Sequence, residues 1–123
     1  MSALASKQCI PCRGDVPPLG RDQLDPLLAQ LNPHWSVQDG VDRNSRDYLF
    51  LVRTFPFDNF KQAMAFAVAV GEMAEQEQHH PDLHVAWGRV VVEVWTHKIA
   101  GLTESDFVFA AKCDEIDARL HRS

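Results

Sequence analysis

The spacing of hydrophobic residues along the chain predicts three helices. From Asp22 onward, leucines at positions 24, 27, 28 and 31 lie on one helical face, and Asn32-Pro33 ends that run. A second helix is expected from Asn59 to about Gln78, with Asp58 as its N-cap. A third begins at Thr103-Glu104-Ser105-Asp106, which has capping-box spacing. Its apolar stripe consists of Phe109, Cys113, Ile116 and Leu120.

Strand-like segments predict a sheet of two strand pairs. Residues 35–38 and 47–55 form the first pair, with a turn signal at Asp39-Gly40 between them. Residues 83–97 form a hairpin whose two-residue turn is Gly88-Arg89. The expected core face of this hairpin carries Leu83, Val85, Trp87, Val90, Val92 and Val94.

The order of these elements predicts the fold class. Helix, two strands, helix, two strands and helix, with no crossover helix inside a strand pair, indicate an antiparallel sheet. We expect an α+β fold: a single two-layer domain with a four-stranded antiparallel sheet and helices packed on one face. This domain is assigned to residues 21–123. Residues 1–20, which contain proline and cysteine, are expected to form an arm on its surface that is dispensable for turnover.

The middle of the second helix, Ala63–Val70, is apolar on every side. A helix of this kind is buried on more than one face, and a domain this small offers only one face to its own sheet. We therefore expect a homo-oligomer, a homodimer or a homotetramer, in which this segment contributes to subunit contacts.

The composition argues against several classes of protein. The chain has 123 residues, 46% of them hydrophobic, and 17 acidic against 12 basic residues give a net charge of -5. This balance argues against nucleic acid or an anionic membrane as a partner, because both require clustered Lys and Arg. No apolar run reaches the roughly 18 residues of a membrane span. The lack of a signal-like stretch in Met1–Gln8 and the odd number of cysteines, three, favour a cytoplasmic protein.

Histidines and carboxylates are expected to gather at one end of the hairpin. In the register set by a Gly88-Arg89 turn, His80 faces His97, and opposed side chains have Cβ atoms about 5 Å apart. Glu75 precedes His79 by four residues, so on a continued helix the two share a face. Imidazoles beside carboxylates suit proton transfer near neutral pH. In the same register, His84 faces Glu93 nearer the turn.

The pattern Glu75-x3-His79-His80-Pro81-x5-Trp87-x9-His97-x8-Asp106 resembles the signature of the pterin-4a-carbinolamine dehydratases at every fixed position. The resemblance covers about residues 20–121 and includes the flanking phrases 55–60 and 100–106. Ile99 stands where animal members carry a cysteine, but other members also use a non-ionising side chain there.

The resemblance implies a hydro-lyase that converts 4a-hydroxytetrahydropterin to quinonoid dihydropterin. Such an enzyme recycles the pterin of aromatic amino acid hydroxylases, which implies a functional link to a hydroxylase, and it needs no metal or redox cofactor. The resemblance makes His79, His80 and His97 the catalytic residues, with His79 and His97 as acid and base and His80 as the residue that binds and orients the pterin. Glu75 and Asp106 would set imidazole tautomer and charge.

Structural roles compete with several of these assignments. Trp87 either contacts the pterin or packs in the core. Asp106 caps the last helix, supports catalysis, or does both. His84 is expected to be structural, as a partner of Glu93. Cys9-x-x-Cys12 is half of a zinc site at most, and Cys113 is expected to be a buried thiol.

Two other functions remain open. One is a non-enzymatic dimerisation or assembly factor, because relatives of this family use the same fold in that way. The other is a metal-binding module built on His79, His80 and His84, although no His-Glu-x-x-His pattern is present.

Overall fold

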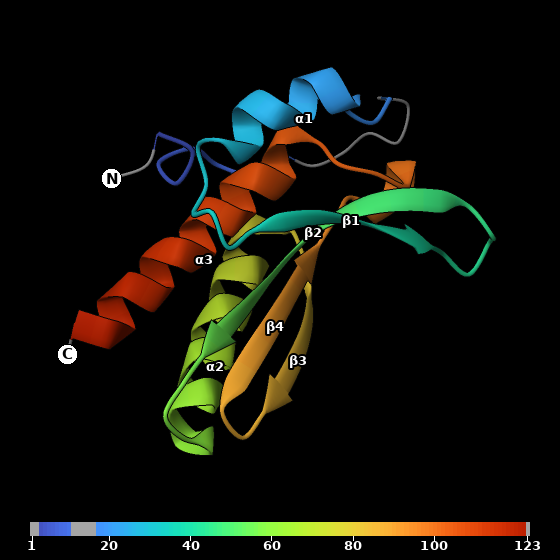
Figure 1. The fold of residues 1–123 in the computed structure, drawn as a ribbon. Coiled ribbons are helices and arrows are strands. Elements are labelled where there is room, and N and C mark those ends of the chain that lie inside the picture. Colours follow the sequence, from blue (N-terminus) through green and yellow to red (C-terminus); the bar gives the residue numbers. More distant parts are fainter. Residues whose placement is uncertain (1–2, 11–16, 123) are drawn as a thin grey trace.

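The computed structural model describes residues 3–10 and 17–122, which form a helical layer packed against one β-sheet (Figure 1). Along the chain the elements are α1 (Arg21–Leu28), β1 (Ser36–Val41), β2 (Asp47–Pro56), α2 (Phe60–Glu77), β3 (Asp82–Ala86), β4 (Arg89–Val94), the 3₁₀ turn η1 (His97–Ile99) and α3 (Glu104–Arg122). The strands lie in the order β1-β2-β4-β3, and each neighbouring pair is antiparallel. The predicted α+β fold is confirmed.

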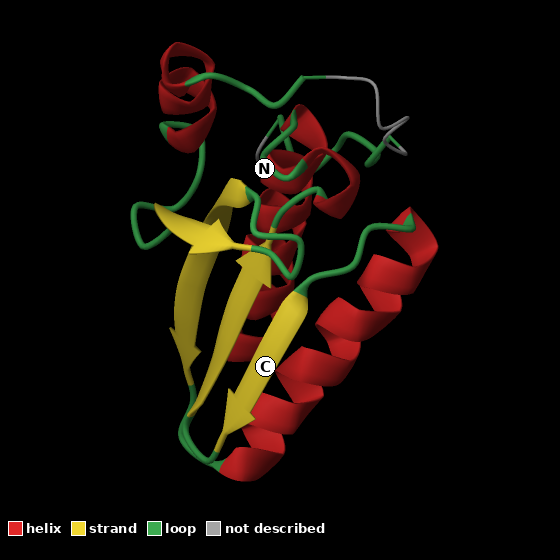
Figure 2. Cartoon of the chain, turned by 90° about the vertical axis from the view of Figure 1, so that its right-hand side faces the viewer, coloured by secondary structure: helices red, strands yellow, loops and turns green. Residues whose placement is uncertain are grey.

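The core lies between the sheet and the helices α2 and α3, which cover the same side of it (Figures 1 and 2). Alternation along β4 turns Val90, Val92 and Val94 inward, and all three are fully buried. The largest side chains opposite them are Phe66 of α2 and Phe109 of α3, also fully buried. Cys113 is buried on α3, as predicted.

Both ends of α2 are set by residues outside the helix. Asn59, not Asp58, is the N-cap: its side chain accepts a hydrogen bond from the backbone N–H of Gln62 at 2.9 Å. The prediction was wrong by one residue because both residue types cap equally well. At the other end Gln78 is left-handed, with φ of 56°. The N–H groups of Gln78 and His79 both bond the carbonyl of Ala74, which ends the helix sharply.

The predicted turn at Asp39-Gly40 is wrong, because both residues lie inside β1. Gly40 pairs with Tyr48 across the ladder, and a Cβ built at Gly40 would lie 2.4 Å from the Tyr48 ring. This glycine therefore provides room for an aromatic ring within a strand instead of forming a turn. The helix α1 likewise ends at Leu28, three residues before the expected limit.

The β3–β4 register differs from the prediction by two residues. Ala86 pairs with Arg89, so Trp87 and Gly88 form the turn in place of Gly88 and Arg89. His84 is opposite Val91, not Glu93. A two-residue shift preserves the faces of a strand, which explains why Val90, Val92 and Val94 were still predicted correctly. Val85, also expected in the core, is 36% exposed on the edge strand β3. Trp87, however, is 68% exposed at the turn and is not a core residue.

The N-terminal arm is part of the packed structure rather than a surface appendage. Leu4, Ala5 and Cys9 are 2%, 5% and 8% exposed and belong to the hydrophobic core. Farther along the chain, the N–H of Leu19 bonds the carbonyl of Leu102 at 2.9 Å. Cys12 lies outside the described residues.

The apolar segment of α2 has a buried side and an exposed side. Ala63, Phe66, Ala67 and Val70 are buried against the core, whereas Val68 is 54% exposed. Among the described residues, no helix is long and apolar enough to span a membrane.

Candidate active site

Three of the predicted catalytic residues meet in one hollow of about 250 Å³. The chain reaches it from the end of α2, from the end of β4 and from η1. Its lining consists of Gln78, His79, His80, Trp95, Thr96, His97 and Lys98. The expected convergence of a helix end with the open end of the hairpin is therefore present, although His80 and His97 are not paired in the ladder.

His79 is paired with Asp106, at the start of α3. Its Nε2 lies 2.6 Å from Oδ1 of Asp106, and the two side chains are 11% and 0% exposed. The other carboxylate oxygen, Oδ2, accepts hydrogen bonds from the Thr96 hydroxyl and the Thr103 backbone N–H, both at 2.8 Å. A carboxylate bound in this way can only accept, so Nε2 of His79 carries a proton. In the neutral imidazole, the lone pair then remains on Nδ1.

The helix cap and the contact with His79 therefore coexist at Asp106. The Thr103 N–H bond to Oδ2 is the capping interaction that the sequence predicted, and the His79 bond uses the other oxygen. One buried carboxylate thus fixes the start of α3, the end of β4 and the imidazole of His79 together.

Glu75 pairs with His80 and not with His79. The two atoms Nε2 and Oε2 are 2.5 Å apart, on side chains that are 57% and 73% exposed. Glu75 and His79 do not share a helical face as they would on a continued helix, because α2 stops at Glu77 and the left-handed Gln78 takes His79 off that face.

His97 is held from two sides on the exposed turn η1. Its ring packs on Trp95, with centroids 4.0 Å apart, and Trp95 stacks on Tyr48 of β2 at 3.7 Å. The guanidinium of Arg46 donates to the His97 carbonyl at 3.2 Å. Asp42 bonds Arg46 in turn, and hydrogen bonds from Arg46 and Asn44 lower the pKa of the Asp42 carboxyl.

His84 and Trp87 lie outside this hollow. His84 is bonded to Glu93 at 3.1 Å, as expected, but diagonally across the ladder. Trp87 lies at the closed end of the hairpin, whereas His79, His80 and His97 flank its open end. Because a five-residue strand separates the two ends, Trp87 is roughly 15 Å from the histidines of its own chain.

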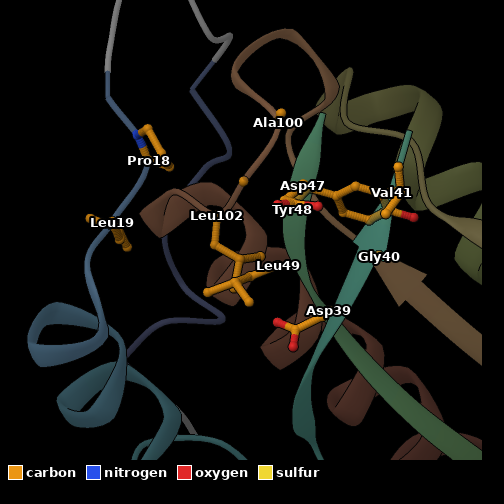
Figure 3. A pocket seen from close by; sticks show the side chains of 11 residues that line it. Pro18, Leu19, Asp39, Gly40, Val41, Asp47, Tyr48, Leu49, Ala100 and Leu102 are labelled. Carbon is orange, nitrogen blue, oxygen red and sulfur yellow. The ribbon is translucent and has the colours of Figure 1, made fainter. Parts of the chain in front are cut away.

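A separate hollow of about 530 Å³ contains no histidine (Figure 3). It lies between the β1–β2 hairpin and the segments 18–19 and 100–102, and its wall is mainly apolar, with the carboxylates of Asp39 and Asp47. Tyr48 belongs to this wall, so the Tyr48–Trp95 stack separates the two hollows.

Sequence reasoning missed four residues of this environment. Thr96 and Thr103 bond Asp106, while Trp95 and Arg46 hold His97. Only Thr103 carried a signal, because it opens the capping box. Trp95 lines the site.

The arrangement is suited to moving protons. Imidazoles change charge near neutral pH, and carboxylates bonded to them fix which ring nitrogen carries the proton. Among the described residues, no group of three or more His, Cys, Asp or Glu side chains is placed to hold a metal ion.

Comparison with known proteins identifies the family. The family model described as pterin 4 alpha carbinolamine dehydratase matches residues 17–116. The chain belongs to this family. A relative from Rubrobacter xylanophilus, provisionally named a pterin-4-alpha-carbinolamine dehydratase, is 52% identical over 94% of this chain and 100% of its own. A similarly named protein from Rickettsia bellii is 47% identical over 91% and 92%.

Two solved structures share the fold. A chain from Brucella melitensis, described as a transcriptional coactivator/pterin dehydratase, superposes with a TM-score of 0.70. It is 30% identical and covers 81% of this chain and 98% of that chain. A pterin dehydratase-like protein described as a RuBisCO assembly factor shares the fold, with a TM-score of 0.53 and 20% identity.

Proposed function

We propose that this protein is a 4a-hydroxytetrahydropterin dehydratase that works by histidine acid–base catalysis. The observation that carries the proposal is the hollow where His79, His80 and His97 meet, with His79 bonded to the buried Asp106. Family membership supports the pterin substrate class.

The reaction needs one proton donor and one proton acceptor. The N5 lone pair forms the C4a=N5 bond as the C4a–O bond breaks, and a proton from the acid lets the hydroxyl leave as water. A base then takes a proton from the pterin ring, so charge and atoms balance. Positioned imidazoles typically contribute roughly 10²- to 10⁴-fold to such a step.

We assign the acid and base roles to His79 and His97. Asp106 accepts from Nε2 of His79 and so makes Nδ1 its reactive nitrogen. His80, oriented by Glu75, binds the pterin. Trp87 contacts the pterin only if another subunit brings it to this hollow, because its own chain keeps it at the far end of the hairpin.

The biological setting follows from the reaction. The product is the quinonoid dihydropterin, so the enzyme recycles the pterin that aromatic amino acid hydroxylases use. We place it in the cytoplasm, with a hydroxylase as a functional partner.

The test is a coupled assay in which a hydroxylase generates the carbinolamine and its dehydration is followed spectroscopically. Purified protein should accelerate dehydration above the uncatalysed rate, and His79→Ala/His97→Ala should remove that acceleration. A folded wild-type protein with no effect would instead favour a non-enzymatic role, as described for the RuBisCO assembly factor of the same fold.

A further inference from the structure

The arm lies against both helices that position the His79–Asp106 pair. Its buried residue Cys9 lies beside the end of α2, and its Sγ is 3.5 Å from the carbonyl oxygen of Ser105 in α3. His79 follows α2 directly, and Asp106 follows Ser105, so the arm touches the two segments whose separation sets this pair.

On the α2 side the contact is through Glu77, two residues before His79. Its Oε1 accepts a hydrogen bond from the backbone N–H of Cys9 at 2.8 Å. Lys112 of α3 lies 3.8 Å from Oε2 of Glu77, and its ammonium donates to the carbonyl of Ala5 at 2.9 Å. The arm thus completes a bridge from α2 to α3.

On the α3 side the contact is through Ser105, which is 7% exposed. Its hydroxyl oxygen accepts from the N–H of Ile10 at 2.8 Å and lies 3.2 Å from the carbonyl of Ile10, to which it donates. Neither Ser105 nor Glu77 lines the hollow of the histidines.

We infer that Ala5, Cys9 and Ile10 of the arm form a positioning clamp that holds the end of α2 to the start of α3 and thereby keeps His79 in register with Asp106. This inference rests on the proposed function. Glu77 and Ser105 are positioning residues, because they act through His79 and Asp106 and not on the substrate. A displacement of about 1 Å in a catalytic group can lower the rate on the order of 10²-fold.

The decisive variants are Glu77→Ala and Ser105→Ala. Each should lower kcat about tenfold or more, with KM within about twofold of wild type, because substrate contacts are unchanged. Glu77→Gln retains an oxygen that accepts from Cys9 and should restore kcat to within about twofold. Lys7→Ala is the matched control, because it removes only the exposed Lys7–Glu104 pair between the arm and α3 and should leave kcat unchanged.

A second readout does not depend on activity. In protein labelled with ¹⁵N-histidine, the NMR chemical shifts of the His79 imidazole nitrogens can be assigned by their loss in His79→Ala. These chemical shifts should change in Glu77→Ala and Ser105→Ala but not in Glu77→Gln. A purely structural arm would lower Tm while kcat and these shifts stayed as in wild type, and that result would overturn the clamp. If wild-type protein has no dehydratase activity, the proposed function fails, and the imidazole shifts alone decide the clamp.

Discussion

Asp106 shows how a single residue joins fold and chemistry. A buried carboxylate is stable only when its oxygens are hydrogen-bonded, and Asp106 has three donors: His79, Thr96 and Thr103. Removing the carboxylate would leave those donors without their acceptor at a buried position. A buried donor without an acceptor costs about 1–3 kcal/mol.

We therefore predict different effects for two Asp106 variants. Asp106→Ala should lower the free energy of unfolding by more than 1 kcal/mol, because several buried donors lose their acceptor. Asp106→Asn should be less destabilising but should still lower kcat at least about tenfold, since one side of an amide can only donate. Urea unfolding and the coupled assay measure the two effects. Wild-type kcat in a folded Asp106→Asn protein would contradict the role given to the pair.

Alanine variants of three histidines test which of them act in the site. His79→Ala and His97→Ala should each lower kcat at least about tenfold. His97→Ala should cost little stability because His97 is exposed, whereas His79→Ala also removes a hydrogen bond to the buried Asp106 and should be destabilising. His84→Ala is the matched control on β3: it should keep kcat within a few-fold and cost at most about 1 kcal/mol, the scale of one cross-strand pair. Equal losses of kcat in His84→Ala and His97→Ala, with both proteins folded, would show that the roles are assigned wrongly.

The sequence predicted the members of the site better than their pairing. Spacing and family resemblance gave Glu75, His79, His80, His97 and Asp106. The partner of Glu75 could not be predicted, because it depends on one left-handed residue, Gln78, which is neither glycine nor asparagine. A helix continued through that position would have brought Glu75 beside His79.

At the level of elements, the local sequence pattern predicted where the strands lie, but contacts between strands decided their turns and register. Asp39-Gly40 and Gly88 are both plausible turn sequences. In the structure, Gly40 provides room for Tyr48, and the second turn begins one residue earlier than predicted. The alternation of apolar residues identifies faces with a period of two, so it could not exclude a register shifted by two residues.

The expected surface position of the N-terminal arm was wrong for a related reason. Its prolines and cysteines indicate irregular structure, but they do not show where irregular structure packs. Backbone hydrogen bonds to Glu77 and Ser105, which no sequence pattern specifies, hold residues 9 and 10 in place.

The docked arm makes a prediction for Cys9. Burial first, and then the negative charge of Glu77, raises the pKa of this thiol to about 12 from an ordinary value of 9.0. Because the thiolate is the nucleophile, iodoacetamide at pH 8 should alkylate Cys9 on the order of 10³-fold more slowly in the folded protein than in urea. Peptide mass spectrometry distinguishes Cys9 from the other cysteines. Equal rates would mean that the arm is not docked in solution.

The same shift sets a direction for alkaline stability. The folded state holds the thiol proton more tightly than the unfolded chain. The contribution of Cys9 is therefore fully present below about pH 9 and is lost as the pH rises toward 12. Unfolding of Cys9→Ala should accordingly depend less steeply on pH between 9 and 12 than unfolding of wild type.

At the scale of the whole molecule, the helix α2 has two separate tasks. Its buried face and its C-terminal end build the core and the site. Its opposite face carries an apolar stripe, Phe60, Met64 and Val68, which are 49%, 38% and 54% exposed and recur every four residues. Contiguous exposed apolar surface of this kind is uncommon on soluble monomers.

We therefore predict that the protein is a homodimer or homotetramer in which this stripe lies between subunits. Val68→Glu would place a charge on the most exposed residue of the stripe and should lower the molar mass measured by light scattering, or lower solubility. Gln76→Glu adds the same charge at an exposed position of α2 eight residues beyond Val68, past the last apolar residue of this row, and should leave the mass unchanged. A wild-type chain that runs as a monomer at working concentration would contradict the predicted oligomer. A Val68→Glu protein of unchanged mass would mean that the subunits contact each other elsewhere. Because Trp87 is far from the histidines of its own chain, the same experiment also shows whether another subunit is available to bring it to the site.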